Sequence, residues 1–113
     1  MFTKEFCIEK IQNAFGGKGT TVLNNWLSEE ELPPHLNLVS TAVVSIGGSV
    51  GNHEHHGEAE IYYIKSGQGE YNDNGNMIQV TQDTVLLCRD GECHGIINTG
   101  DSELEIIAII VKG

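Results

Sequence analysis

Two segments of the chain, residues 36–46 and 104–111, are apolar at both even and odd positions. A strand with one face in water alternates apolar and polar residues, so this pattern predicts two strands that are covered on both faces. One face of each strand would fill the protein core. In a chain of 113 residues the economical cover for the other face is a second copy of the same subunit, which predicts a homodimer.

Shorter runs of strand-forming residues recur along the rest of the chain, and glycine, asparagine or aspartate separates them. These runs are residues 20–23, 60–64, 84–87 and 94–98, together with a hairpin over 69–80 that turns at Asp73-Asn74-Gly75-Asn76. Seven or eight short strands at regular spacing predict an all-β sandwich or barrel.

The first 35 residues are less regular. Residues 2–15 fit either a helix or an edge strand. Residues 24–35 are a polar excursion in which Ser28 can cap one helical turn through Glu31, and Pro33-Pro34 stops any helix. The single tryptophan, Trp26, has three interpretations: it shields the mouth of a ligand pocket, packs against a partner subunit, or belongs to ordinary core or rim packing.

Composition narrows the function classes. Six Lys plus Arg against sixteen Asp plus Glu give a formal net charge of −10, which repels phosphate backbones and anionic lipid. We therefore expect no nucleic-acid and no membrane partner. No secretory signal and no apolar run of transmembrane length is visible. The cysteines are odd in number, at positions 7, 88 and 93, and lack a zinc-type pairing, so they predict reduced thiols in a cytoplasmic protein.

Residues 47–67 carry the candidate chemistry. His53 and His55 are two residues apart, so in an extended strand both imidazoles project from the same face. Gly57 lets the chain bend, and Glu60 opens a new strand-forming run. Two imidazoles and a carboxylate that converge from adjacent strands form a ligand set for a first-row transition metal.

The spacing Gly47-x5-His53-x-His55-x4-Glu60-x6-Gly67 resembles the first signature motif of the cupin superfamily, with every defining residue in place. The stretch 91–98, with His94 four residues before Asn98, is similar to the end of the second cupin motif. Its start departs from the family, because Gln82-Asp83 stands near the usual Gly-Asp and Cys88-Arg89-Asp90 replaces the loop with proline. The resemblance covers residues 36–111.

This resemblance implies a double-stranded β-helix, the jelly-roll barrel of cupins, with six to eight antiparallel strands in one domain. Residues 36–113 would form the barrel, and residues 1–35 an N-terminal arm and edge segments of the same domain. One divalent transition metal (Fe, Mn, Ni, Co, Cu or Zn) would bind to His53, His55, Glu60 and His94. The alternative for these four residues is a degenerate cupin without metal.

Further residues are candidates for the pocket around this metal. Tyr62 and Ile64 share the face of Glu60, Glu58 shares its parity, and Ile96 would line the barrel. For Tyr62 the alternatives are a bond to a metal-bound ligand and simple wall lining. Arg89 either clamps a substrate carboxylate or is an exposed loop residue.

The same region holds residues with weaker claims. Glu54 and His56 should face the opposite side of the strand and be solvated, and Cys93 should face away from the metal. Cys88 can approach the pocket mouth, where thiolate ligation competes with a role as a small buried hydrophobe.

Two functions fit these features. One is a metal-dependent enzyme acting on a small organic molecule, of the dioxygenase, decarboxylase, isomerase or lyase type. The other is a non-catalytic module that binds or senses a small ligand or metal. The cupin fold hosts many functions and does not separate the two.

Overall fold

The computed structural model describes residues 1–113 and shows an almost entirely β protein. Its strands are β1 (Cys7–Gln12), β2 (Thr20–Asn25), β3 (Leu36–Val44), β4 (Ser49–Glu54), β5 (Glu58–Ser66), β6 (Gln68–Asp73), β7 (Asn76–Thr81), β8 (Val85–Cys88), β9 (Cys93–Asn98) and β10 (Leu104–Lys112). Two 3-10 turns, η1 (Ala14–Gly16) and η2 (Glu29–Glu31), interrupt them. No helix is long and apolar enough to cross a membrane.

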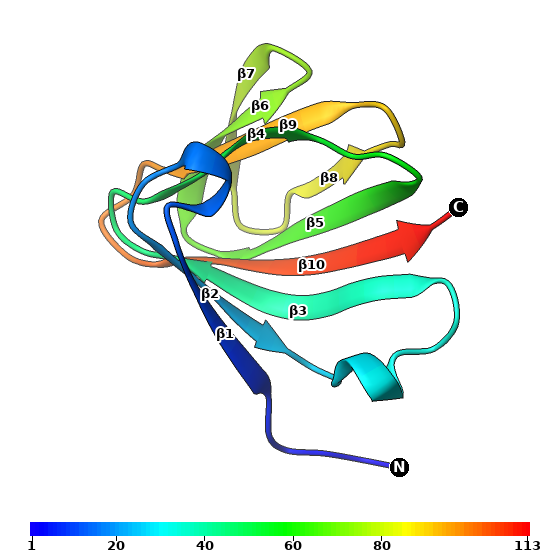
Figure 1. Cartoon of the computed structure of the whole chain (residues 1–113). Coiled ribbons are helices and arrows are strands. Elements are labelled where there is room, and N and C mark those ends of the chain that lie inside the picture. The colour runs from blue at the N-terminus through cyan, green and yellow to red at the C-terminus, as the bar shows by residue number, and fades with distance from the viewer.

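The strands form two facing antiparallel sheets (Figure 1), which confirms the predicted jelly roll. One sheet has six strands in the order β1-β2-β3-β10-β5-β8, and the other has four in the order β4-β9-β6-β7. The total of ten strands exceeds the six to eight expected, because β1 and β2 extend the larger sheet at its edge.

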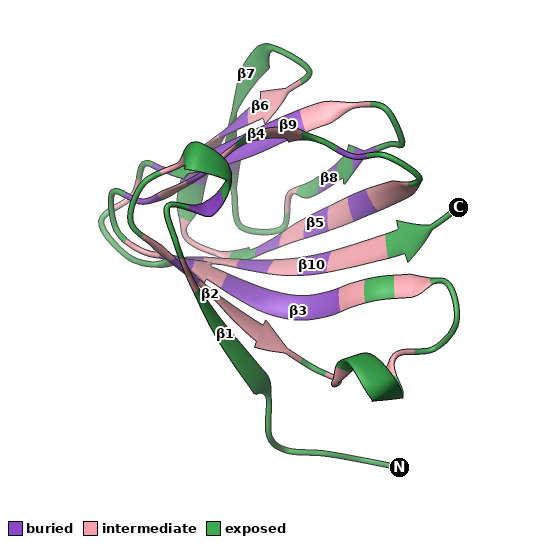
Figure 2. Cartoon of the chain, viewed as in Figure 1, coloured by how far each residue is buried: buried purple, intermediate pink, exposed green.

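Strand register sorts the long strands into an inner and an outer face. Ala42 of β3 stands opposite Ile106 of β10, which stands opposite Ile64 of β5, and all three side chains are buried. The next position along each strand points outward. Figure 2 shows the consequence, with buried positions on β3, β10 and β5 and an exposed β1 at the sheet edge. The core therefore lies between the sheets, as the apolar pattern predicts.

The turns that were predicted from the preferences of a few neighbouring residues are present in the structure. The hairpin β6–β7 turns at Asn74 and Gly75, whose φ values of 51° and 95° lie in the left-handed region that asparagine and glycine tolerate. At η2 the Ser28 amide donates a hydrogen bond of 2.9 Å to the Glu31 carboxylate, which lowers the pKa of Glu31. Within residues 2–15, which fitted either a helix or an edge strand, residues 7–12 form the edge strand β1 and residue 14 begins the turn η1.

Asn98, at the end of β9, ties the two sheets together at one end of the barrel. Its side-chain amide lies 3.1 Å from the carbonyls of Val44 and Ser45 and 2.9 Å from that of Ser102. Its side-chain oxygen accepts a bond of 2.9 Å from the Gly100 amide. Asn98 is 3% exposed and Val44 is fully buried, so the Val44 carbonyl has little access to water as a substitute partner.

We expect Asn98→Ala to lower the free energy of unfolding by about 2–3 kcal/mol, because four hydrogen bonds are lost and the buried Val44 carbonyl loses its side-chain donor. Asn52→Ala is the matched control, since Asn52 is exposed on β4, and it should change stability by less than about 0.5 kcal/mol. Urea denaturation of both variants measures the difference. Equal stabilities would contradict the role given to Asn98.

Candidate metal centre

A β-bulge in β4 directs His53 into the barrel. Val50 pairs with Ile96 and His53 pairs with His94, so three steps along β4 match two steps along β9. The extra residue shifts the alternation of β4 by one position. Val50 and His53, which are three residues apart, can therefore both point inward, and His53 stands directly opposite His94.

The turn after β4 places the other two candidates. The His55 amide donates to the Glu92 carbonyl at 3.1 Å, and the His55 carbonyl accepts from the Gly91 amide at 2.7 Å, so the segment is anchored beside the loop before β9. Gly57 then adopts a φ of 73°, which permits the sharp turn into β5. Glu60 follows on the inner face of β5 and is 6% exposed.

The four predicted residues converge on one point. One ligand atom each from His53, His55, Glu60 and His94 lies within 4.8 Å of the others. The Nε2 atoms of His55 and His94 are 3.0 Å apart, and both lie close to Glu60 Oε1, at 3.0 and 3.1 Å. His55, Glu60 and His94 are buried, and His53 is half-buried.

The other ring nitrogen of each histidine has its own partner. His53 Nδ1 lies 2.8 Å from the Gly51 carbonyl, and His55 Nδ1 lies 2.9 Å from the Glu58 carboxylate. Carbonyl and carboxylate oxygens only accept hydrogen bonds, so each of these Nδ1 atoms carries the proton. In the neutral imidazole this leaves a lone pair on Nε2, which is the form that binds a metal.

The third histidine is oriented by a tyrosine, whose hydroxyl can donate to or accept from Nδ1. His94 Nδ1 lies 2.9 Å from the Tyr71 hydroxyl, and both side chains are almost completely buried. Tyr71 comes from β6, which pairs with β9. All three imidazoles are therefore oriented by a bond at Nδ1, and Nε2 of His55 and His94 points at Glu60.

The electrostatics of the cluster favour a bound cation. Glu60 is a buried carboxylate whose only salt-bridge partners are His55 and His94, with no lysine or arginine in reach. Burial lowers the pKa of His53, which favours its neutral form. Lone pairs and a carboxylate at hydrogen-bond distances repel one another unless a proton or a metal ion lies between them. The donors therefore fit one divalent transition metal.

The five pocket candidates lie in different places. An apolar cavity of about 200 Å³ adjoins the cluster, and only Tyr62 among the five lines it. Glu58 bonds to His55 behind the cluster, and Arg89 is exposed on its loop. Ile64 and Ile96 are buried in the core and do not border the cavity.

The remaining candidates lie outside the cluster. Cys88 is buried, and burial raises the pKa of its thiol to about 11, so it stays protonated at neutral pH. Cys93 is half-buried and its Sγ lies 3.6 Å from Glu54 on the outer side of β4. His56 pairs with Glu54 at 2.8 Å, in the exposed position expected from its parity.

Two neighbours of the cluster were not identified from the sequence. Phe15 of η1 stacks on His53 with ring centroids 3.8 Å apart and an interplanar angle of 11°. Tyr71 orients His94 from 23 residues away. Alternation within β6 predicts that Tyr71 points inward, but no local pattern indicates which histidine it meets. The position of Phe15 follows from tertiary packing alone.

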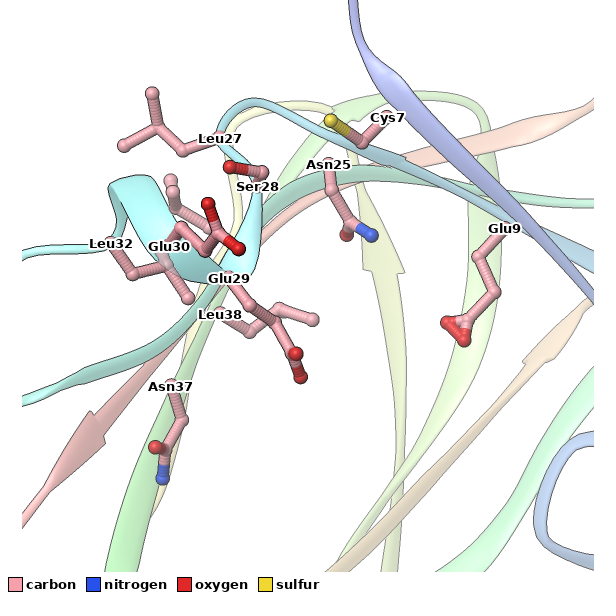
Figure 3. A pocket seen from close by; sticks show the side chains of 11 residues that line it. Cys7, Glu9, Asn25, Leu27, Ser28, Glu29, Glu30, Leu32, Asn37 and Leu38 are labelled. Carbon is pink, nitrogen blue, oxygen red and sulfur yellow. The ribbon is translucent and has the colours of Figure 1, made fainter.

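The largest hollow of the protein is not at this cluster. It has a volume of about 710 Å³ and lies beside β1, β2, β3 and η2 (Figure 3). Glu9, Glu29 and Glu30 line it, but they do not converge on a common point as the four residues of the cluster do. We therefore assign the candidate chemistry to the buried cluster and its apolar cavity.

Comparison with known proteins agrees with this geometry. The family model described as Cupin domain matches residues 40–110. An oxalate-binding protein from Thermotoga maritima is 38% identical over 109 residues, which cover 96% of this chain and 90% of the relative. A crystal structure of a predicted oxalate decarboxylase from T. maritima, also 38% identical, has a TM-score of 0.91 and covers 96% of this chain and 95% of that one.

A more distant structure shares the fold alone. The cupin domain of Schizosaccharomyces pombe Cnp3 has a TM-score of 0.74 at 12% identity, with 98% of this chain and 90% of that chain covered.

The Tyr71–His94 bond generates a prediction about metal affinity. Tyr71→Phe removes only the hydroxyl that holds His94 Nδ1, and we expect the affinity for Co²⁺ or Zn²⁺ to fall about 10- to 100-fold without unfolding. Tyr63→Phe is the control, because the Tyr63 hydroxyl bonds to Asp83 on the outside of β5. Competitive titration against a chromogenic chelator measures both affinities. An unchanged affinity for Tyr71→Phe would show that the bond does not orient a ligand.

Proposed function

The chain belongs to the cupin family, and we propose that it binds one divalent transition metal through His53, His55, Glu60 and His94 and holds a small oxygen-chelating acid there. The observation that carries this proposal is the convergence of three oriented imidazoles and a buried carboxylate that lacks a lysine or arginine partner. When bound, such a metal attracts and polarises a carboxylate or carbonyl oxygen of the ligand.

The relatives support a small acid as the ligand. One is named an oxalate-binding protein, and another is described as a predicted oxalate decarboxylase. Four protein ligands leave room in the coordination sphere of a first-row metal for oxygen atoms of a ligand. A bound cation also offsets part of the net charge of −10, which otherwise repels an anionic acid.

Different residues of the site have different roles. Gly51 and Glu58 hold His53 and His55 in one tautomer and orientation, and Tyr71 orients His94. The apolar cavity excludes bulk water, which strengthens electrostatic interactions at the cluster. Tyr62 lines the cavity, and burial raises the pKa of its phenol well above the usual value, so the hydroxyl remains a hydrogen-bond donor toward a ligand oxygen.

A second candidate function is catalysis on the bound acid, by dioxygenase, decarboxylase, isomerase or lyase chemistry. Tyr62 is the observation that favours it, because its neutral phenol can donate a hydrogen bond to negative charge that develops on a ligand oxygen. Glu58 is engaged with His55 and Asn37, and Arg89 is exposed on its loop, so neither is placed to serve as a proton-transfer group. Binding is therefore the function that the geometry supports best.

The outer face of the larger sheet supports the proposed homodimer. Val39, Ile109, Ile61 and Leu87 stand side by side across β3, β10, β5 and β8. A second row, with Ile107 between Thr41 and Tyr63, runs parallel to it. Val39 and Thr41 are already buried in the single chain, so the part of this face that a second copy would cover centres on Ile61, Leu87 and Ile107. All three cysteines are free, which fits the cytoplasmic location that we propose.

The metal proposal predicts that His55→Ala loses the metal while the chain stays folded. The protein should bind one equivalent of metal per chain, and oxalate should bind only after metal is loaded. His56→Ala is the matched control, because that neighbouring histidine is exposed and pairs with Glu54 outside the cluster. Elemental analysis and calorimetric titration with oxalate measure these properties. Full metal occupancy in His55→Ala would contradict the assignment.

The dimer proposal predicts that sedimentation at micromolar concentration detects a dimer whose interface buries more than about 1,000 Å² in total. Ile107→Glu should convert it to a monomer, because a charge in the centre of an apolar interface is left without a partner. Ile78→Glu, on β7 of the other sheet, is the control and should remain dimeric. A wild-type chain that sediments only as a monomer would refute the interface.

A further inference from the structure

The cavity beside the cluster of His53, His55, Glu60 and His94 is larger and more apolar than a simple chelating acid requires. Its volume is about 200 Å³, and 12 of its 16 lining residues are hydrophobic. His53, His55, Glu60 and Tyr62 border the cavity, and the aliphatic residues that border it come chiefly from β2, β3 and β10. Oxalate, by contrast, consists of two joined carboxylates and has no apolar part to place there.

The volume of the cavity sets the size of the group that it can accept. An apolar cavity of about 150 Å³ is large enough to bind benzene. A cavity of about 200 Å³ can therefore accept a phenyl ring or a branched aliphatic chain of similar size. Burying such a group is favourable in proportion to the apolar area removed from water, so the cavity contributes affinity only to ligands that carry one.

One polar group of the cavity wall has no partner in the protein. Thr21 of β2 lines the cavity and is 3% exposed, and its Oγ1 makes no hydrogen bond. Its cross-strand neighbours are Ile11 and Val44, both apolar. A buried hydroxyl without a partner destabilises the protein, and a ligand group that bonds to it removes that cost.

The cavity is closed on one side by the turn η1, which is held rigidly against β4. A Cβ atom on Gly51 would lie 2.0 Å from the Phe15 carbonyl oxygen, so only glycine allows this approach. Phe15 itself has φ 51° and ψ 37°, a left-handed conformation that is unfavourable for a residue with a side chain. The tight contact with β4 keeps the Phe15 ring on His53, and Phe15 lines the cavity.

We infer that the ligand of this site is an acid with two parts. A chelating head binds at the proposed metal, and an apolar body of about the size of a phenyl ring lies in the cavity. A hydrogen-bonding group on that body meets the Thr21 hydroxyl, which makes Thr21 a specificity-determining residue. The inference rests on the proposed function for the head of the ligand. The apolar body distinguishes this acid from oxalate.

The first experiment compares two acids with the same head. Phenylpyruvate and pyruvate both present a 2-oxo acid, and only the former has a ring. Calorimetry on the metal-loaded protein should show at least tenfold tighter binding of phenylpyruvate. Ala42→Leu fills the cavity from β3, and it should abolish this preference while metal binding is retained. Ala108→Val, a smaller change in the same wall, replaces it if Ala42→Leu does not fold.

The second experiment does not depend on the metal. Phenol and benzene carry no chelating head, and chemical-shift changes of the methyl groups of Thr21 and Ala42 report their entry into the metal-free protein. Phenol should bind more tightly than benzene by at least fivefold after correction for solubility. Thr21→Val, which keeps the shape and removes the hydroxyl, should eliminate this difference and raise the melting temperature of the free protein.

The outcomes separate the inference from the function on which it rests. A protein that binds no metal refutes the proposed function, and the phenol titration then decides whether the cavity takes an apolar body. A protein that binds metal and oxalate but prefers pyruvate, or binds both 2-oxo acids equally, overturns the inference and leaves the proposed function intact. Equal binding of phenol by wild type and Thr21→Val overturns the role of Thr21.

Discussion

The close approach of electron-rich side chains in the His53–His55–Glu60–His94 cluster is the interaction on which the local structure depends. Two imidazole nitrogens lie 3.0 Å apart, and both face Glu60 Oε1. Such a contact between lone pairs is unfavourable, so the surrounding structure must hold it in place. The bulge in β4, the left-handed turn at Gly57 and the Tyr71–His94 bond each fix one part of it. The two sheets of the jelly roll position this bulge, this turn and this hydrogen bond.

The sequence predicted the cluster because its information is mostly local. The spacing of His53, His55 and Glu60 fits two adjacent strands joined by a glycine turn, and the resemblance to cupins added His94. The hairpin at Asn74-Gly75 and the turn at Ser28 were predictable for the same reason, since each rests on the backbone preferences of a few neighbouring residues.

The surroundings of the cluster were harder to predict, because they depend on long-range register. Tyr71 meets His94 only because β6 lies beside β9, and Thr21 enters the cavity only because β2 pairs with β3. Ile64 and Ile96 were placed on the inner face by alternation, which does not tell a wall of the cavity from the core beside it. Ten strands replaced the expected six to eight because β1 and β2 add to the barrel; residues 20–23 were predicted as a strand, whereas residues 2–15 fitted a helix as well as an edge strand.

Three residues in energetically unfavourable states line the same cavity. Phe15 is in an unfavourable backbone conformation, Thr21 keeps a buried hydroxyl without a partner, and Glu60 is a buried carboxylate without a lysine or arginine partner. All three line the cavity beside the cluster, while the core on its far side, around Ile64 and Leu104, is apolar and fully buried. A folded chain retains such local conflicts where a ligand relieves them. A metal at the cluster would relieve only the conflict at Glu60, so the hydroxyl of Thr21 and the apolar volume beside it fit a second occupant, the organic body of the acid that we infer.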